Sequence, residues 1–187
     1  SNHTILANRR LRFCPEKTSP YLEIMGGTWG KGAVGVMGEV AWEDEDEEEK
    51  GIRIRAVREG WGVGLLDYVV GCGEGIFVEV VVGETCWDMV LGIVNPDKFD
   101  YDDMDKIYGV SCLGYFGEAT AGYGDDFGAG DRVGMLLHAG SLQFFKNDEP
   151  LGVFTVSIDF PAAIAVGVCD TDSTVTILPH YVPLYRS

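Results

Sequence analysis

One stretch of the sequence, residues 130–154 (GDRVGMLLHAGSLQFFKNDEPLGVF), constrains the fold more than any other. Its two apolar-rich runs, residues 132–138 and 141–146, are separated by Ala139 and Gly140, a pattern typical of a tight turn between strands. Residues 147–150 (NDEP) supply a second turn. The stretch therefore predicts a β-hairpin that leads into a third strand.

Short apolar runs with turn signals between them continue along the rest of the chain, which holds 26 glycines. We expect further strands at residues 11–14, 21–24, 33–42, 51–57, 75–82, 87–94, 109–116, 163–168 and 174–178. Only residues 95–107 can hold a short helix, and their many Asp residues make a long loop an equal alternative. So many short strands with glycine-rich turns predict an all-β sandwich or barrel.

Periodicity indicates how the strands are buried. Residues 76–80 and 175–177 alternate apolar and polar side chains, which predicts strands with one wet face. Residues 80–82 and 162–168 are apolar throughout, which predicts strands covered on both faces.

The length of 187 residues suits one domain, residues 1–187, and no apolar run approaches the roughly 20 residues that cross a bilayer. We therefore expect no membrane partner, and the net charge of −16 disfavours nucleic acid as a partner. Residues 43–49 (EDEDEEE) belong to an acidic insertion, residues 43–50, which we interpret as solvated. A docking segment for a basic partner is the alternative.

The cysteines are odd in number and far apart, and no CxxC pair occurs: Cys14, Cys72, Cys86, Cys112 and Cys169. We expect buried free thiols in a reducing compartment such as the cytoplasm. The N-terminus shows neither an initiator Met nor the apolar centre of a secretory signal, so we expect a piece of a longer protein.

Motifs for catalysis or cofactors are incomplete. Residues 71–75 (GCGEG) approach a dinucleotide-binding loop, but the third glycine comes early and a strand follows. Ser111 lacks the closing glycine of a nucleophile elbow, and the three His are scattered. Five Asp in residues 97–105 could supply oxygen ligands to calcium, but their positions do not match the EF-hand pattern. We expect no catalytic residues, no cofactor and no metal.

Three segments resemble the SPRY domain of the PRY-SPRY group: residues 75–80 (GIFVEV), residues 122–134 (GYGDDFGAGDRVG) and residues 141–153 (SLQFFKNDEPLGV). Residues 161–163 (PAA) and 174–177 (TVTI) are similar to its closing segments. Asp148 stands where the family usually has Gly. The resemblance covers about residues 52–178, and residues 1–42 would form an N-terminal extension or PRY-like strands.

The resemblance implies a bent sandwich of two antiparallel sheets, a concanavalin-like jelly roll with very little helix. It also implies a non-catalytic module that binds a short peptide or partner protein through loops at one rim. Carried over by position, the partner-binding residues would be Arg58, Trp61, Cys72, Phe99, Tyr101, Cys169, Asp170, Thr171 and Asp172. We expect Tyr101 to be exposed and Trp87 and Phe144 to lie in the core, while Trp61 suits core and rim equally.

Three functions remain open. The first is a monomeric protein-interaction module, within a larger protein, that binds a peptide or partner, including a basic one, and presents substrates for ubiquitination. The second is a lectin-like sandwich that binds carbohydrate, with calcium at the Asp-rich loop as an option. A hydrolase ranks last, because no convincing set of catalytic side chains stands in the sequence.

Overall fold

The structure is a computed structural model that describes residues 11–26, 51–112, 114–116, 125–154, 157–179 and 182–184. The strand expected at residues 33–42, the acidic insertion and residues 122–124 of the resemblance lie outside the described residues. The strands are β1 (Phe13–Thr18), β2 (Leu22–Met25), β3 (Ile52–Ala56), β4 (Trp61–Val70), β5 (Gly75–Val82), β6 (Asp88–Val94), β7 (Tyr108–Ser111), β8 (Gly114–Phe116), β9 (Arg132–His138), β10 (Ser141–Lys146), β11 (Glu149–Phe154), β12 (Ala162–Cys169), β13 (Thr174–Ile177) and β14 (Val182–Leu184).

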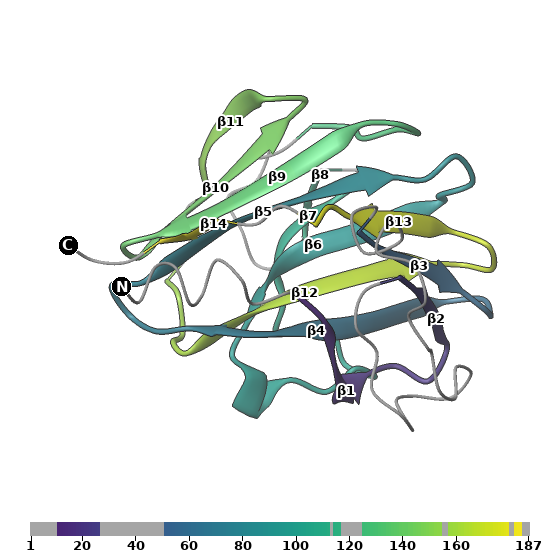
Figure 1. Cartoon of the computed structure of the whole chain (residues 1–187), viewed down its shortest axis with the longest axis horizontal. Helices are drawn as coiled ribbons and strands as arrows, with labels where there is room; N and C mark the ends of the chain where they lie inside the picture. The colour runs from purple at the N-terminus through teal and green to yellow at the C-terminus, as the bar shows by residue number, and fades with distance from the viewer. Residues whose placement is uncertain are drawn as a thin grey trace.

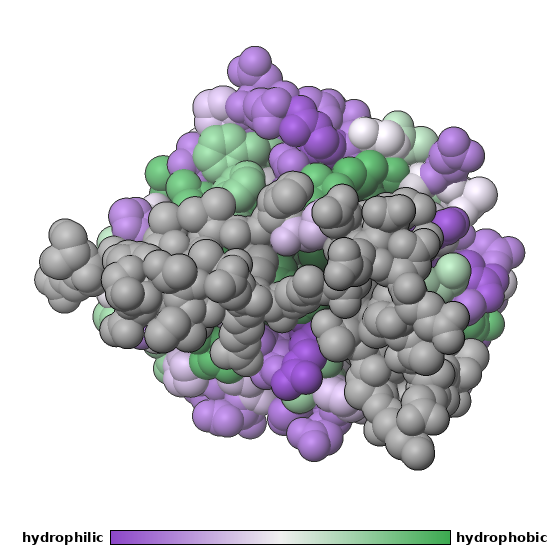
Figure 2. Space-filling view, in the orientation of Figure 1, coloured by the Kyte–Doolittle hydropathy of each residue, from purple (hydrophilic) through white to green (hydrophobic). Residues whose placement is uncertain are grey.

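Two antiparallel sheets lie face to face (Figure 1). The first sheet has the strand order β1-β4-β12-β6-β7-β8, and the second has the order β11-β10-β9-β5-β13-β3-β2 with β14 paired to β5. Hydrophilic residues gather at the upper edge of the face in Figure 2, over β11 and its neighbours. The expected all-β sandwich of two antiparallel sheets is confirmed.

The hairpin expected from the sequence is formed by β9 and β10, which pair from Ser141 opposite His138 onwards. Ala139 and Gly140 both have positive φ, as two-residue hairpin turns require. The second turn is shorter than expected, because β11 begins at Glu149. Asp148 has φ 73°, a conformation that Asp tolerates better than most side chains, which explains how it replaces Gly.

The longest strand, β4, was not expected from the sequence, because Gly62 and Gly64 interrupt its apolar pattern. Both glycines lie against neighbouring strands. A Cβ at Gly62 would lie 2.9 Å from Cδ2 of Leu22, and one at Gly64 would lie 2.6 Å from Oγ1 of Thr18. A side chain at position 64 would therefore collide with β1, and one at position 62 would have to displace the end of the Leu22 side chain. The short strand β14 was also missed.

One strand expected at residues 109–116 is divided in two. β7 and β8 pair with each other, and Ser111 lies opposite Gly114, so the chain reverses at Cys112. This turn carries no Pro, Asn or Asp, so the local sequence resembles a continuous strand.

The main core lies between the sheets and confirms most of the expected periodicity. In β5 the side chains of Ile76, Val78 and Val80 are buried, whereas those between them are only partly buried. Val81, which follows Val80, is also only partly buried, so residues 80–82 are not covered on both faces as expected. Phe144 is fully buried in the main core, as expected.

β12 is buried on both faces, as its apolar sequence predicts. Ile164 and Val166 belong to the main core, whereas Ala163 and Ala165 belong to a second cluster on the outer face of the first sheet. We call this second cluster the outer cluster; its buried members are Val63, Leu65, Val90, Val94, Phe99, Ile107, Ala163 and Ala165.

The connection between β6 and β7 covers the outer cluster. It begins with a short 3₁₀ helix, Pro96–Lys98, in which the Asn95 side chain accepts a hydrogen bond from the Asp97 N–H. The chain then continues irregularly, and Phe99 and Ile107 are buried against the sheet. Of the two alternatives for residues 95–107, the long loop is therefore the better description. No helix among the described residues is long and apolar enough to span a membrane.

Candidate partner-binding rim

Three loops meet at one end of the sandwich, on the right in Figure 1. They meet because β12 lies between β4 and β6, with Cys169 opposite both Trp61 and Asp88. We call these loops and adjoining strand ends the rim: residues 57–61, residues 83–87 and residues 169–173. The Asp170 N–H donates to the Gly60 carbonyl at 2.9 Å, and the Gly60 N–H donates to Asp170 Oδ1 at 2.8 Å.

Ser173 joins the loops beneath the rim surface. Its hydroxyl oxygen accepts a hydrogen bond from the backbone N–H of Trp87 at 2.8 Å, and its carbonyl oxygen accepts one from the backbone N–H of Ala56 at 3.0 Å. The Thr85 hydroxyl donates to the Asp172 carbonyl at 2.6 Å. The three loops are therefore held to one another by hydrogen bonds as well as by their strands.

Two Asp residues of the rim adopt positive φ, Asp170 at 71° and Asp172 at 70°. Such a conformation costs roughly 1–2 kcal/mol for most side chains, and Asp is among the residues that accept it most readily. The Asp170 carboxylate is fixed by the Gly60 N–H, and Asp172 Oδ1 lies 2.7 Å from Arg55 Nη1. The shape of this loop is thus set by its own side chains.

Arg55 and Arg58 connect the rim to β2 and to Tyr21, the residue before it. The Arg55 guanidinium also binds Glu23, and hydrogen bonds with Glu23 and Asp172 hold the pKa of Arg55 above its usual value. The guanidinium carbon of Arg58 lies 3.1 Å from the ring centroid of Tyr21, a cation–π arrangement. Arg58 is exposed to solvent, and its guanidinium already contacts the Tyr21 ring.

Trp87 is the most exposed large apolar residue of the rim, with 77% of its surface accessible. The expectation that it lies in the core is wrong. Trp87 precedes β6, and its backbone N–H donates a hydrogen bond to the Ser173 hydroxyl. Its side chain is exposed to solvent. The turn-forming residues Gly83, Glu84 and Thr85, shortly before Trp87 in the chain, are the sequence signal that marks a loop position.

The structure brings together six of the residues expected from the resemblance: Arg58, Trp61, Cys169, Asp170, Thr171 and Asp172. Thr171 and Asp172 are exposed, whereas Trp61 is half-buried. Cys169 is also partly buried, and burial together with Asp170 raises its pKa to about 11. It is a neutral thiol at neutral pH.

The other three lie elsewhere. Cys72 is exposed in the turn between β4 and β5, at the opposite end of the sandwich. Phe99 is only 6% exposed because it is buried in the outer cluster, so it supports the loop and does not offer a free side chain. Tyr101 is half-buried, not exposed as expected, and packs on the outer cluster together with Trp61.

Carboxylates predominate among the exposed charges of the rim. Glu59, Glu84 and Asp172 are exposed, and Asp170 is partly buried. Arg58 is the exposed cation of these three loops. A positively charged segment would therefore be attracted to this end of the molecule.

The Asp-rich loop uses its carboxylates internally. Asp100 Oδ1 accepts the Asp102 N–H at 2.9 Å, and Asp103 Oδ1 accepts the Asp105 N–H at 3.0 Å. Among the described residues, no three His, Cys, Asp or Glu side chains are arranged to hold a metal ion. The calcium alternative gains no support from this geometry.

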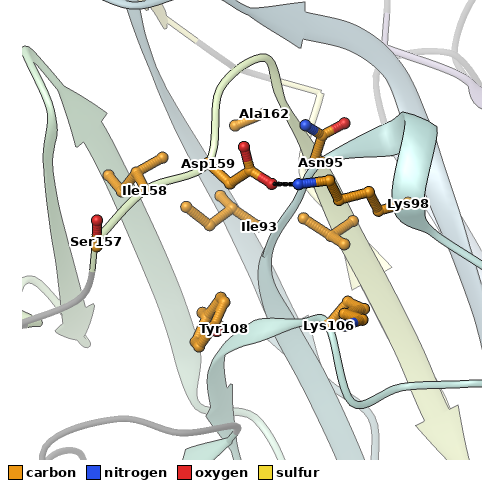
Figure 3. A pocket seen from close by; sticks show the side chains of 10 residues that line it. Ile93, Asn95, Lys98, Lys106, Tyr108, Ser157, Ile158, Asp159 and Ala162 are labelled. Atoms are coloured by element: carbon orange, nitrogen blue, oxygen red, sulfur yellow. Dashed lines mark hydrogen bonds and ion pairs between the residues drawn. The ribbon is translucent and has the colours of Figure 1, made fainter.

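A cavity of about 180 Å³ opens at the far end of β6, away from the rim (Figure 3). Aliphatic side chains form one part of its wall, and the Lys98 ammonium lies 2.5 Å from Asp159 Oδ2 across it. This contact raises the pKa of Lys98 and lowers the pKa of Asp159. The lining residues are Ile93, Val94, Asn95, Lys98, Lys106, Tyr108, Ser157, Ile158, Asp159 and Ala162, none of them expected as a site residue.

Comparisons with known proteins match this architecture at the level of structure. No protein-family model and no curated protein matches the chain. The SPRY domain of human HERC1 is similar with a TM-score of 0.63 and 14% identity, over 90% of this chain and 98% of that one. The TRIM65 PSpry domain has a TM-score of 0.57 and 15% identity, over 92% and 93% of the two chains.

A further human SPRY domain has a TM-score of 0.51 and 16% identity, over 68% of this chain and 91% of that one. The chain therefore has the fold of SPRY domains, and the fold implied by the sequence resemblance is confirmed.

Proposed function

We propose that this chain, a SPRY fold, is a non-catalytic protein-interaction module that captures a short peptide or partner protein at the rim. The observation that carries the proposal is the rim itself: three loops tied together by hydrogen bonds present the indole of Trp87 to solvent. Other domains with this fold, those of HERC1 and TRIM65, share the scaffold on which these loops are mounted.

An exposed Trp on a braced loop suits binding for energetic reasons. A Trp side chain supplies a large apolar area, a polar N–H and few rotatable bonds, and such residues dominate many interface energies. The hydrogen bonds at Gly60, Thr85 and Ser173 order the surrounding loops before any partner arrives. Binding then loses less conformational entropy than it would on loose loops.

The charges of the rim favour a basic partner. Exposed Glu59, Glu84 and Asp172 lie in the same three loops as Trp87. A Lys or Arg side chain can meet both a carboxylate and an aromatic face in such a setting. We therefore propose that the bound segment carries at least one cation.

The module acts, in this proposal, as a monomeric recognition domain of a larger protein. All five cysteines are free thiols in the structure, which supports a reducing intracellular compartment. Recruitment of substrates for ubiquitination is a narrower prediction that follows from the sequence resemblance alone. It is tested by joining the domain to a ubiquitin ligase and following ubiquitination of a captured partner.

Peptide display followed by photo-crosslinking tests the proposed surface. Peptides selected on the immobilised chain would carry a photoreactive group, and the crosslinked positions would be mapped by mass spectrometry. We expect crosslinks in residues 57–61, 83–87 and 169–173, and few at the cavity beside Lys98. Crosslinks concentrated at the cavity or around Cys72 would refute the rim as the binding surface.

A further inference from the structure

Two cysteines meet at one end of the first sheet. Cys86 lies in the loop before β6, and Cys112 follows the last residue of β7. Their strands are neighbours, with Val90 opposite Ser111. Asp88 binds both cysteines: its Oδ1 accepts the Cys112 N–H at 2.9 Å, and its carbonyl accepts the Cys86 thiol at 3.3 Å.

The two side chains also influence each other. Their interaction lowers the pKa of Cys112 and raises the pKa of Cys86, and burial raises the pKa of Cys86 further. Negative charge is therefore better accommodated on the Cys112 sulfur than on the Cys86 sulfur.

Both cysteines pack at the main core. Cys112 is 6% exposed and belongs to the main core, and Cys86 packs against that core from the loop. Cys72 lies at the opposite end of the sandwich. Both cysteines are hydrogen-bonded to Asp88 at the same end of two paired strands, which brings their side chains to one place in the fold.

We propose that Cys86 and Cys112 are an oxidation site that closes into a disulfide when the protein meets hydrogen peroxide. This inference does not depend on the proposed function. It assigns a reaction to two side chains in a molecule whose five cysteines are free.

The reaction balances as a two-electron oxidation. The Cys112 thiolate attacks one peroxide oxygen, an S–O bond forms, the O–O bond breaks, and hydroxide leaves and takes up the Cys112 proton as water. The Cys86 sulfur, after losing its proton, attacks the Cys112 sulfur, the S–S bond forms, and hydroxide leaves as a second water. Two thiols lose two electrons and two protons, and one peroxide becomes two waters.

The bridge joins the loop that carries Trp87 to the end of β7. Cys86 is adjacent to Trp87 in the chain, so the bond shortens the free length of that loop. Formation of the disulfide would therefore modify the residue that precedes the exposed Trp87 in the chain. Reduction by a dithiol reverses it.

Mass spectrometry of the oxidised chain tests the proposal. The reduced, folded chain would be treated with hydrogen peroxide, alkylated in denaturant and digested without reductant. We expect a peptide pair joined through Cys86 and Cys112 that disappears after dithiothreitol. Both cysteines fully alkylated, under conditions that oxidise the exposed Cys72, would overturn the proposal.

Two variants sharpen the result. Cys72→Ser removes the exposed thiol at the opposite end and should leave the bridge unchanged. Cys86→Ser should stop the reaction at a sulfenic acid on Cys112, detected as a dimedone adduct. If Cys86→Ser does not fold, the linked peptide of the wild-type chain alone decides the question.

Discussion

Asp170 and Gly60 hold each other through a reciprocal pair of hydrogen bonds between two different loops. The Asp170 N–H reaches the Gly60 carbonyl at 2.9 Å, and the Asp170 carboxylate accepts the Gly60 N–H at 2.8 Å. Because Asp170 also has φ 71°, one residue fixes both the shape of its own loop and its distance from the next. Asp170 is therefore a positioning residue of the rim.

Asp170→Ala should lower the free energy of unfolding by about 1–3 kcal/mol, since it loses a hydrogen bond and places Ala in the left-handed region. Asp170→Asn keeps an acceptor oxygen and a side chain that tolerates positive φ, so it should lose less than half as much. Urea unfolding curves of the two variants measure the difference. Equal losses would mean that the Gly60 hydrogen bond does not stabilise the loop.

Gly64→Ala should destabilise the fold by roughly 1–3 kcal/mol, because the new Cβ would lie 2.6 Å from Thr18 Oγ1 and 2.7 Å from a ring carbon of Phe13. Gly71→Ala is the matched control, since its nearest neighbour would be the Glu74 carboxylate at 3.5 Å. Thermal unfolding of both variants should show a clear loss for the first and little change for the second. A stable Gly64→Ala chain would contradict the close pairing of β1 with β4.

Asp131 should make stability depend on pH in the acid range. Hydrogen bonds from the Gly128 N–H and the Asn147 side chain lower the pKa of Asp131. A carboxyl group with a lower pKa in the folded state stabilises the fold above its unfolded pKa of about 3.9, and this contribution disappears as pH falls through the folded pKa.

Asp131→Asn should therefore be less stable than the wild type at pH 7, by less than about 1 kcal/mol because solvent screens the site. The deficit should shrink as the pH falls below about 4. Melting temperatures of both chains between pH 2.5 and 7 provide the measurement. A deficit that stays constant across this range would show that the Asp131 charge is not responsible.

Salt should weaken capture of a basic peptide at the rim. Exposed Glu59, Glu84 and Asp172 attract cations over a distance that shortens as ionic strength rises. Association rates measured from about 0.05 to 0.5 M salt should fall more steeply than dissociation rates change. A rate independent of salt would assign the recognition to apolar contacts instead.

Much of the fold was predictable because periodicity and turn chemistry act locally. The hairpin of β9 and β10, the alternation in β5 and the two-sided burial of β12 all follow from neighbouring residues. β4 was missed because Gly62 and Gly64 serve contacts with Leu22 and Thr18, which are far away in the sequence. Close approach between distant strands leaves no local pattern.

The site was less predictable than the fold. Trp87 begins an apolar run and resembles a core residue in sequence, but it lies in the loop between β5 and β6 and is exposed in the structure. Phe99 belongs to a loop, yet the outer cluster buries it. Cys72 lies at the opposite end from Asp170, because a turn at one end of an antiparallel sandwich is followed by a turn at the other.

The affinity of Trp87→Ala for a selected peptide tests directly whether the rim is the binding surface. Calorimetry would compare this variant with wild type and with Val69→Ala, which truncates a residue 51% exposed near the opposite end of β4. We predict at least about a tenfold weaker affinity for Trp87→Ala, equivalent to about 1.4 kcal/mol, with an unchanged melting temperature. Wild-type affinity in Trp87→Ala, or an equal loss in Val69→Ala, would contradict the account.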